Sequence, residues 1–102
     1  MTGNDDIVRD NREHQRYELV RNGEVLGEIL YRTRPGVIVL VHTEVAASAE
    51  GHGLGSRLVA GALDDIRARG LRLVPVCPFV AAYLRRHPEQ QDLVARDRVV
   101  SQ

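Results

Sequence analysis

The hydrophobic pattern begins with three strand-like runs separated by two turns. Residues 17–20 and 25–31 are rich in apolar and β-branched residues, and the Asn-Gly pair at 22–23 is a strong hairpin signal. A second turn at 34–36 contains Pro and Gly, and a longer run follows at 37–45. Both faces of this third run are mostly apolar, so we expect a central strand in a three-stranded antiparallel meander.

A helical pattern follows the third strand. Apolar residues recur at three- and four-residue intervals between 53 and 69, which predicts an amphipathic helix, and residues 71–76 form a further strand-like run. The helix allows this last strand to lie parallel to the third through a right-handed crossover. Pro75 and Pro78 cannot donate ladder hydrogen bonds, so the parallel strands should part near Cys77. The pattern predicts an α+β fold with a meander, a β-α-β crossover and a short C-terminal helix.

Composition and charge narrow the class of protein. Residues 1–15 are polar and lack periodicity, so we expect a flexible leader before one compact domain at 16–102. Basic and acidic side chains both number 14, and this zero net charge argues against nucleic-acid binding. The single cysteine excludes an internal disulfide, and no apolar run is long enough for a membrane span, so the expected compartment is the cytoplasm. Histidine and cysteine positions lack the paired spacing of a zinc site, so we expect no metal.

Residues 50–56, with the sequence EGHGLGS, lie between the third strand and the helix. Glycines let backbone N–H groups approach an anion, and the first helical turn adds unpaired donors and a positive dipole end, so this loop predicts a pyrophosphate site. A P-loop would require Gly-Lys-Ser/Thr, where the chain has Gly55-Ser56-Arg57. A dinucleotide fingerprint would require an acidic residue after the next strand, which instead ends in Pro-Val-Cys.

The loop also matches the coenzyme A loop of the Gcn5-related N-acetyltransferases (GNAT), Arg/Gln-x-x-Gly-x-Gly/Ala, with Glu50 as the one departure. A carboxylate near a pyrophosphate is repulsive unless it turns to solvent or pairs with an arginine. From about residue 16 to 94, the chain resembles small single-domain members of this superfamily. The motifs that carry the resemblance are HTEV at 42–45, the glycine loop, LDD at 63–65, RG at 69–70, VPVCPF at 74–79, Tyr83 and HPE at 87–89.

The resemblance implies the GNAT-like (acyl-CoA N-acyltransferase) fold and acetyl-CoA as cosubstrate. In that family, backbone groups of the glycine loop bind the pyrophosphate. The pantetheine arm enters between the splayed parallel strands and pairs with the edge of the first, here residues 43–47. The residues implied to bind the cofactor are Val45, Ala47, Gly51, His52, Gly53, Leu54, Gly55 and Ser56.

Two residues near the C-terminal helix are candidates for the chemistry. Cys77 precedes Pro78, a favoured first helical residue, so its thiolate should be stabilised at a helix N-terminus. It is either a nucleophile or a small buried apolar residue. Tyr83 shares a helix face with Phe79 and His87. The resemblance implies that Tyr83 protonates the departing coenzyme A thiolate, and the alternative is a core tyrosine.

His42 and Glu44 are the candidate general bases. Strict alternation places them on one strand face with Ile38 and Leu40, about 7 Å apart by strand rise. Either could take a proton from an amine through water, although a lone histidine on an apolar strand is more often structural. Glu44 is the better candidate because it borders the expected cofactor cleft.

These features lead us to expect an N-acetyltransferase that transfers acetyl to a primary amine of a small molecule or a protein. The amine attacks directly, with Glu44 or His42 as base, or Cys77 carries the acetyl group first. The alternative is a non-catalytic coenzyme A-binding sensor or interaction module. Only the turn at 21–24 occupies the place where larger relatives carry one or two helices, which favours this alternative. The sequence allows a monomer or a homodimer.

Overall fold

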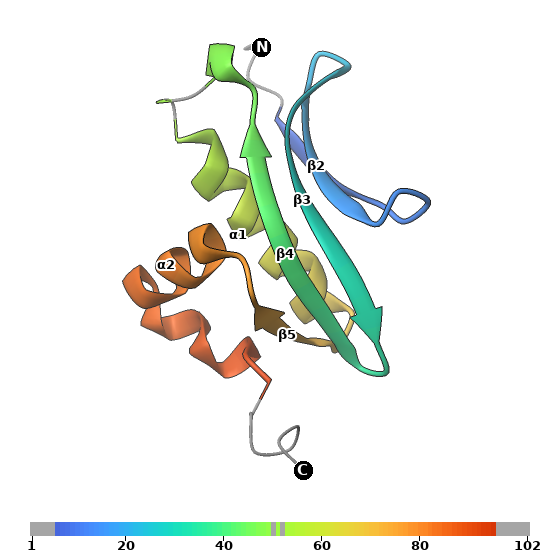
Figure 1. Ribbon diagram of the computed structural model, residues 1–102, viewed down its shortest axis with the longest axis vertical. Helices are drawn as coiled ribbons and strands as arrows, with labels where there is room; N and C mark the ends of the chain where they lie inside the picture. The colour runs from blue at the N-terminus through green and yellow to red at the C-terminus, as the bar shows by residue number, and fades with distance from the viewer. Residues whose placement is uncertain (1–5, 50, 52, 96–102) are drawn as a thin grey trace.

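The computed structural model describes residues 6–49, 51 and 53–95. Successive strands pair in one sheet, antiparallel from β1 to β4 and parallel between β4 and β5. Helix α1 contacts all five strands, and α2 packs against β4, β5 and α1 (Figure 1). The elements are β1 (Ile7–Asn11), β2 (Arg16–Arg21), β3 (Glu24–Arg34), β4 (Val37–Val45), the 3-10 turn η1 (Ala47–Ala49), α1 (Leu54–Ala68), β5 (Arg72–Pro75), α2 (Pro78–Arg86) and the 3-10 turn η2 (Pro88–Leu93).

The structure confirms the predicted α+β fold and the crossover. Helix α1 buries its whole apolar stripe against the sheet, and the bounds of β4 are those expected from the hydrophobic run. In the turn between β2 and β3, Asn22 and Gly23 have φ values of 51° and 81°. Positive φ at both positions is the requirement of a type I′ hairpin turn, and Asn-Gly satisfies it at low cost. The buried α1 residues are Leu54, Leu58, Val59, Ala62, Leu63 and Ile66.

Residues 7–11 of the expected flexible leader instead form β1, so the meander has four strands. Ile7 lies opposite Val20, and Asn11 lies opposite Arg16. The apolar pattern missed this strand because its polar side chains make specific contacts. Asp10 accepts a hydrogen bond from the Tyr31 hydroxyl at 2.6 Å, and other β1 side chains bind β2. A strand stabilised in this way carries no clear period-two hydrophobic signal.

A bulge in β4 changes which residues share a face. Leu30 pairs with His42 and Tyr31 pairs with Leu40, so Val41 has no partner in the β3 ladder. One extra residue reverses the alternation. The expected common face of Ile38, Leu40, His42 and Glu44 is therefore wrong: the first two are buried on the helix side, and the last two are exposed on the other face.

Asp6 connects the start of the sheet to α1. Its carboxylate accepts hydrogen bonds from Arg21 Nε at 2.6 Å and Arg21 Nη2 at 2.8 Å, and it also contacts Nη1 of Arg57. The Asp6 side chain is only 4% exposed. Hydrogen bonds from Arg21 hold the pKa of Asp6 below its usual range. This contact lies near the first turn of α1 and joins residues that are 51 positions apart.

Glu18 is the one fully buried charge among the described residues, with 1% of its side chain exposed. Arg9 Nε and Arg16 Nε donate to its carboxylate at 2.9 and 2.7 Å, and Asn11 Nδ2 donates at 3.0 Å. Burial raises the pKa of Glu18, but hydrogen bonds from Asn11, Arg16 and Arg9 outweigh burial and lower the pKa to about 2. The ionised form therefore holds β1 to β2.

We expect this carboxylate to make folding pH-dependent. A pKa lowered from 4.5 contributes stability above pH 4.5, and this contribution is lost as the pH falls toward 2. The stability difference between wild type and Glu18→Gln should shrink by about 3 kcal/mol between pH 7 and pH 2. Urea unfolding followed by circular dichroism measures this difference. Glu13→Gln in the exposed β1–β2 turn is the control, and an equal pH response of the two variants would contradict the assignment.

Candidate functional site

The β4–β5 ladder ends where the sequence predicts. The last pair is Leu40 with Pro75, and the N–H of Cys77 makes one further bond to the Leu40 carbonyl at 2.9 Å. Pro78 then begins α2, which leads the chain away from β4. Within the described residues, no strand pairs with β4 on this side beyond Leu40, so the edge at residues 43–45 is free for another extended group.

Two glycines in the left-handed region lead into α1, Gly51 with φ 85° and Gly53 with φ 74°. Gly53 is the N-cap, and because glycine has no side chain, no side-chain hydrogen bond caps the helix. The Arg57 N–H donates to the Gly53 carbonyl at 3.1 Å. The N–H groups of residues 54–56 therefore lack partners within the helix. Together with the positive end of the helix dipole, they form a site that can bind an anion.

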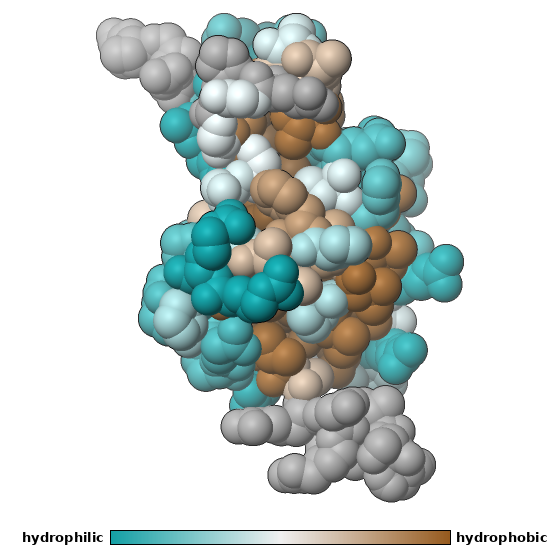
Figure 2. Space-filling view, turned by 60° about the vertical axis from the view of Figure 1, so that its left-hand side comes forward, coloured by the Kyte–Doolittle hydropathy of each residue, from teal (hydrophilic) through white to brown (hydrophobic). Residues whose placement is uncertain are grey.

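A hollow of about 380 Å³, the cofactor-side hollow, lies between the β4 edge and this first helical turn. Figure 2 brings the α2 side of the molecule forward and shows hydrophobic surface beside hydrophilic surface there. The predicted cofactor-binding residues line the hollow except Ala47, which lies in η1, and His52, which with Glu50 lies outside the described residues. The lining residues are Thr43, Val45, Ala49, Gly51, Gly53, Leu54, Gly55, Ser56 and Phe79.

Sequence reasoning missed Phe79 as a lining residue, whereas Thr43 belongs to the strand edge at 43–47 that the resemblance implied for the pantetheine arm. Phe79 was placed on a face of α2 with Tyr83, which is itself 6% exposed and lines neither hollow described here. The signal that could have found Phe79 is its position directly after Pro78, at the end of α2 that meets β4. The Val41 bulge, which the sequence did not predict, turns Thr43 toward the helices.

Cys77 is the N-cap of α2, as the sequence predicts, and is 2% exposed. Its Sγ lies 3.2 Å from the hydroxyl oxygen of Thr43. Thiolates are nucleophilic when a positive environment and access to solvent favour them. The helix N-terminus supplies the first condition, but burial opposes the second. The proposed nucleophilic role stays a prediction, and the geometry favours the alternative of a small core residue.

Tyr83 stacks on His87, with ring centroids 4.0 Å apart and an interplanar angle of 23°. This contact confirms that the two residues share one face of the C-terminal segment. Burial raises the pKa of Tyr83, and the charges of Glu89 and Asp64 raise it further. The phenol is therefore protonated at neutral pH, which is the form required of a proton donor.

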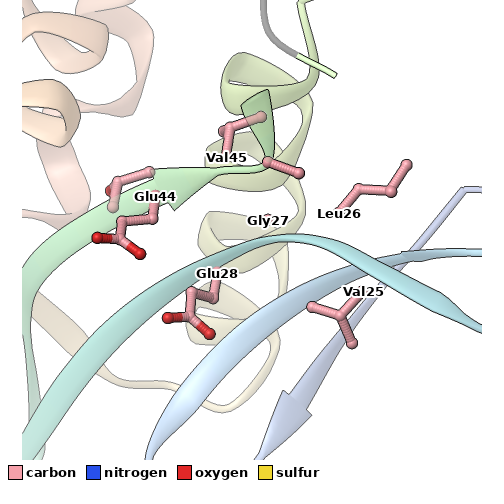
Figure 3. Close-up of a pocket in the computed structure, with 8 residues that line it drawn as sticks. Val25, Leu26, Gly27, Glu28, Glu44 and Val45 are labelled. Atoms are coloured by element: carbon pink, nitrogen blue, oxygen red, sulfur yellow. The ribbon is translucent and has the colours of Figure 1, made fainter. Parts of the chain in front are cut away.

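His42 and Glu44 lie next to each other on the exposed face of β4, with Nε2 3.2 Å from Oε2. Glu44 pairs across the ladder with Glu28, and Figure 3 shows the two carboxylates pointing to the same side of the sheet. Glu28 and Glu44 line a second hollow of about 500 Å³, which we call the outer hollow. Thr43 and Val45 line both hollows, so the two sites meet at the end of β4. The remaining lining residues are Val25, Leu26, Gly27 and Ala46.

The described residues contain neither a candidate metal site nor a candidate membrane span. No three His, Cys, Asp or Glu side chains gather closely enough to hold a metal ion in residues 6–49, 51 and 53–95. No helix in that part of the chain has both the length and the apolar content needed to cross a membrane. The polar groups that line the two hollows are backbone amides, the carboxylates of Glu28 and Glu44, and the hydroxyls of Thr43 and Ser56.

Residues 16–93 match the model of the family described as GCN5-related N-acetyl-transferase. Because this match covers most of the chain, the protein belongs to the GCN5-related N-acetyltransferase family. The family agrees with the resemblance carried by the glycine loop and the Cys77 segment. No curated protein matches the chain.

Solved structures share the fold. A GCN5-like protein from Staphylococcus aureus is 22% identical, with a TM-score of 0.67 over 93% of this chain and 91% of that one. The ribosomal-protein-S18-alanine N-acetyltransferase of Escherichia coli is 19% identical, with a TM-score of 0.57 over 85% and 54% of the chains. A GNAT acetyltransferase from Brucella melitensis, in complex with acetyl-CoA, is 25% identical, with a TM-score of 0.52 over 71% and 50%. The present chain spans about half the length of the last two proteins.

The burial of Cys77 predicts a slow thiol reaction. Cys77 is the only cysteine, so labelling with a chromogenic disulfide reports on this side chain alone. We expect labelling of the native protein to be at least roughly tenfold slower than labelling in urea, because the reagent must wait for local opening. Equal rates in the two conditions would show an accessible thiol and would support the nucleophilic role.

Proposed function

We propose that the protein is an N-acetyltransferase that binds acetyl-CoA and passes the acetyl group to an amine acceptor. The observation that carries the proposal is the cofactor-side hollow, which joins a helix N-terminus without a side-chain cap to a free strand edge. Family membership and the acetyl-CoA bound to the Brucella relative support it. In this chain, the backbone N–H groups of residues 54–56 would hold the pyrophosphate, and the β4 edge would hold the pantetheine arm.

Bound acetyl-CoA supplies an activated thioester, and the chain's own residues bind, orient and move protons. Glu44 has 66% of its side chain exposed at the outer hollow, where an acceptor amine can approach it. The carboxylate, or His42 beside it, takes the proton that the amine loses. Tyr83 would give a proton to the departing thiolate, which requires its buried hydroxyl to reach the cofactor-side hollow that it does not line. Thr43 and Val45 line both hollows, so the acceptor side and the cofactor side meet at these two residues.

Two other routes rest on particular observations. In the covalent route, Cys77 carries the acetyl group first, which requires that its contact with Thr43 opens. In the non-catalytic alternative, the protein binds coenzyme A without turnover. The outer hollow favours this second candidate, because no described helix covers that side of β3 and β4. A coenzyme A-binding module with an uncovered acceptor side would need another molecule to complete it.

Calorimetric titration with acetyl-CoA and with coenzyme A tests the proposal directly. We expect both to bind in a single site, because the N–H cradle and the strand edge are common to both ligands. Intact-protein mass spectrometry of the same samples should show no stable acetyl adduct if transfer is direct. A 42 Da increment on Cys77 would establish the covalent route. Absence of binding would overturn the proposal.

Substitution of the candidate bases separates transfer from binding. Once an amine acceptor is found by screening, Glu44→Gln should lower kcat/KM by about 10²-fold while the Kd for coenzyme A changes by less than about twofold. His42→Gln should have the smaller effect if Glu44 is the base. The exposed Glu13→Gln variant is the control. Unchanged kcat/KM in both site variants, across pH 6 to 9, would remove these residues from the mechanism.

A further inference from the structure

Phe79 bridges the two helices at the cofactor-side hollow. It is the only phenylalanine of the chain and the second residue of α2. Its ring reaches the first turn of α1, where a Cβ built on Gly55 would lie 2.7 Å from Cζ and 3.2 Å from Cε2. The tip of the ring therefore rests against the Gly55 backbone. This contact joins α2 directly to the helical turn whose N–H groups face the hollow.

Gly53 and Gly55 are glycines for different reasons. Gly53 has a φ of 74°, which side chains rarely adopt. Gly55 lies inside α1 and is not among the glycines with positive φ, so its backbone conformation would accept alanine. What excludes a side chain at Gly55 is the Phe79 ring. A Cβ contact below 3.0 Å forces one group to move, and the ring is the group with freedom to do so.

The ring forms the wall of the hollow opposite β4. Thr43 and Val45 line one side, and Phe79 lines the α2 side. Although apolar, Phe79 is 39% exposed, and part of that exposed surface faces the hollow. A flexible ligand arm that pairs with the β4 edge needs a second surface to hold it there. An aromatic ring held at its tip by α1 supplies such a surface at little further entropic cost.

We propose that Phe79 is a ligand-binding residue that closes the pantetheine channel on the α2 side, and that Gly55 is glycine in this chain to seat the Phe79 ring. This inference rests on the proposed function. It makes the second glycine of the loop a packing partner of α2, in addition to a part of the phosphate cradle. It also makes the effects of substitutions at Gly55 and Phe79 interdependent.

A double-mutant cycle tests the inference, with the Kd for coenzyme A measured by calorimetry. Phe79→Ala should weaken binding about tenfold, and Phe79→Leu, which keeps an apolar wall, by less. Gly55→Ala should weaken binding because it displaces the ring into the channel. In the double variant, Gly55→Ala should cause no further loss beyond Phe79→Ala. Val76→Ala is the matched control, since Val76 is 59% exposed and does not line the hollow.

The outcomes distinguish the inference from the proposed function. If wild type binds coenzyme A and Phe79→Ala binds equally well, the inference is overturned and the proposed function stands. Additive effects of the two substitutions would overturn the role of the Gly55 contact. If wild type does not bind, both proposals fail together. Circular dichroism of each variant tests whether it is folded. Because Phe79 is 39% exposed, we expect the Phe79 variants to fold even if Gly55→Ala does not.

Discussion

The early end of the β4–β5 ladder is the constraint on which the rest of the site depends. Pro75 and Pro78 lack N–H groups, so the ladder cannot continue, and the last bond from this segment reaches Leu40. The chain must then turn into α2, which leaves the β4 edge unpaired beside the start of α1. The two missing N–H groups of Pro75 and Pro78 therefore account both for the free edge of β4 and for the cofactor-side hollow beside the N-terminus of α1.

The Val41 bulge determines how β4 serves two sides of the sheet. It turns Thr43 and Val45 toward the helices and leaves His42 and Glu44 on the open face. A regular strand would have placed a carboxylate toward the buried thiol of Cys77, where its desolvation would be costly. One unpaired residue therefore separates the uncharged lining of the cofactor-side hollow from the ionisable groups on the open face.

Most of the fold and much of the candidate site could be predicted because several local sequence signals lie in the segment from the glycine loop to Pro78. Gly53 and the two prolines act through their own backbone, and the apolar stripe of α1 shows in its helical spacing. The effects of all of them are therefore visible in the sequence. β1 was missed because Asp10 and its neighbours are stabilised by partners on β2, on β3 and at Arg69, which follows α1, and no local pattern shows such partners. The Val41 bulge and the Phe79 contact were missed for the same reason, since both depend on residues distant in the chain.

The contacts of β1 have a practical consequence for anyone who trims the protein. The family match begins at Arg16, so a shortened version designed on it would discard the first strand. Glu18 would keep Arg16 but lose Arg9 and Asn11, and Arg57 near the glycine loop would lose Asp6. The similarity boundary and the folding boundary therefore differ, and recombinant versions of this protein should retain the segment from Asp6 onward.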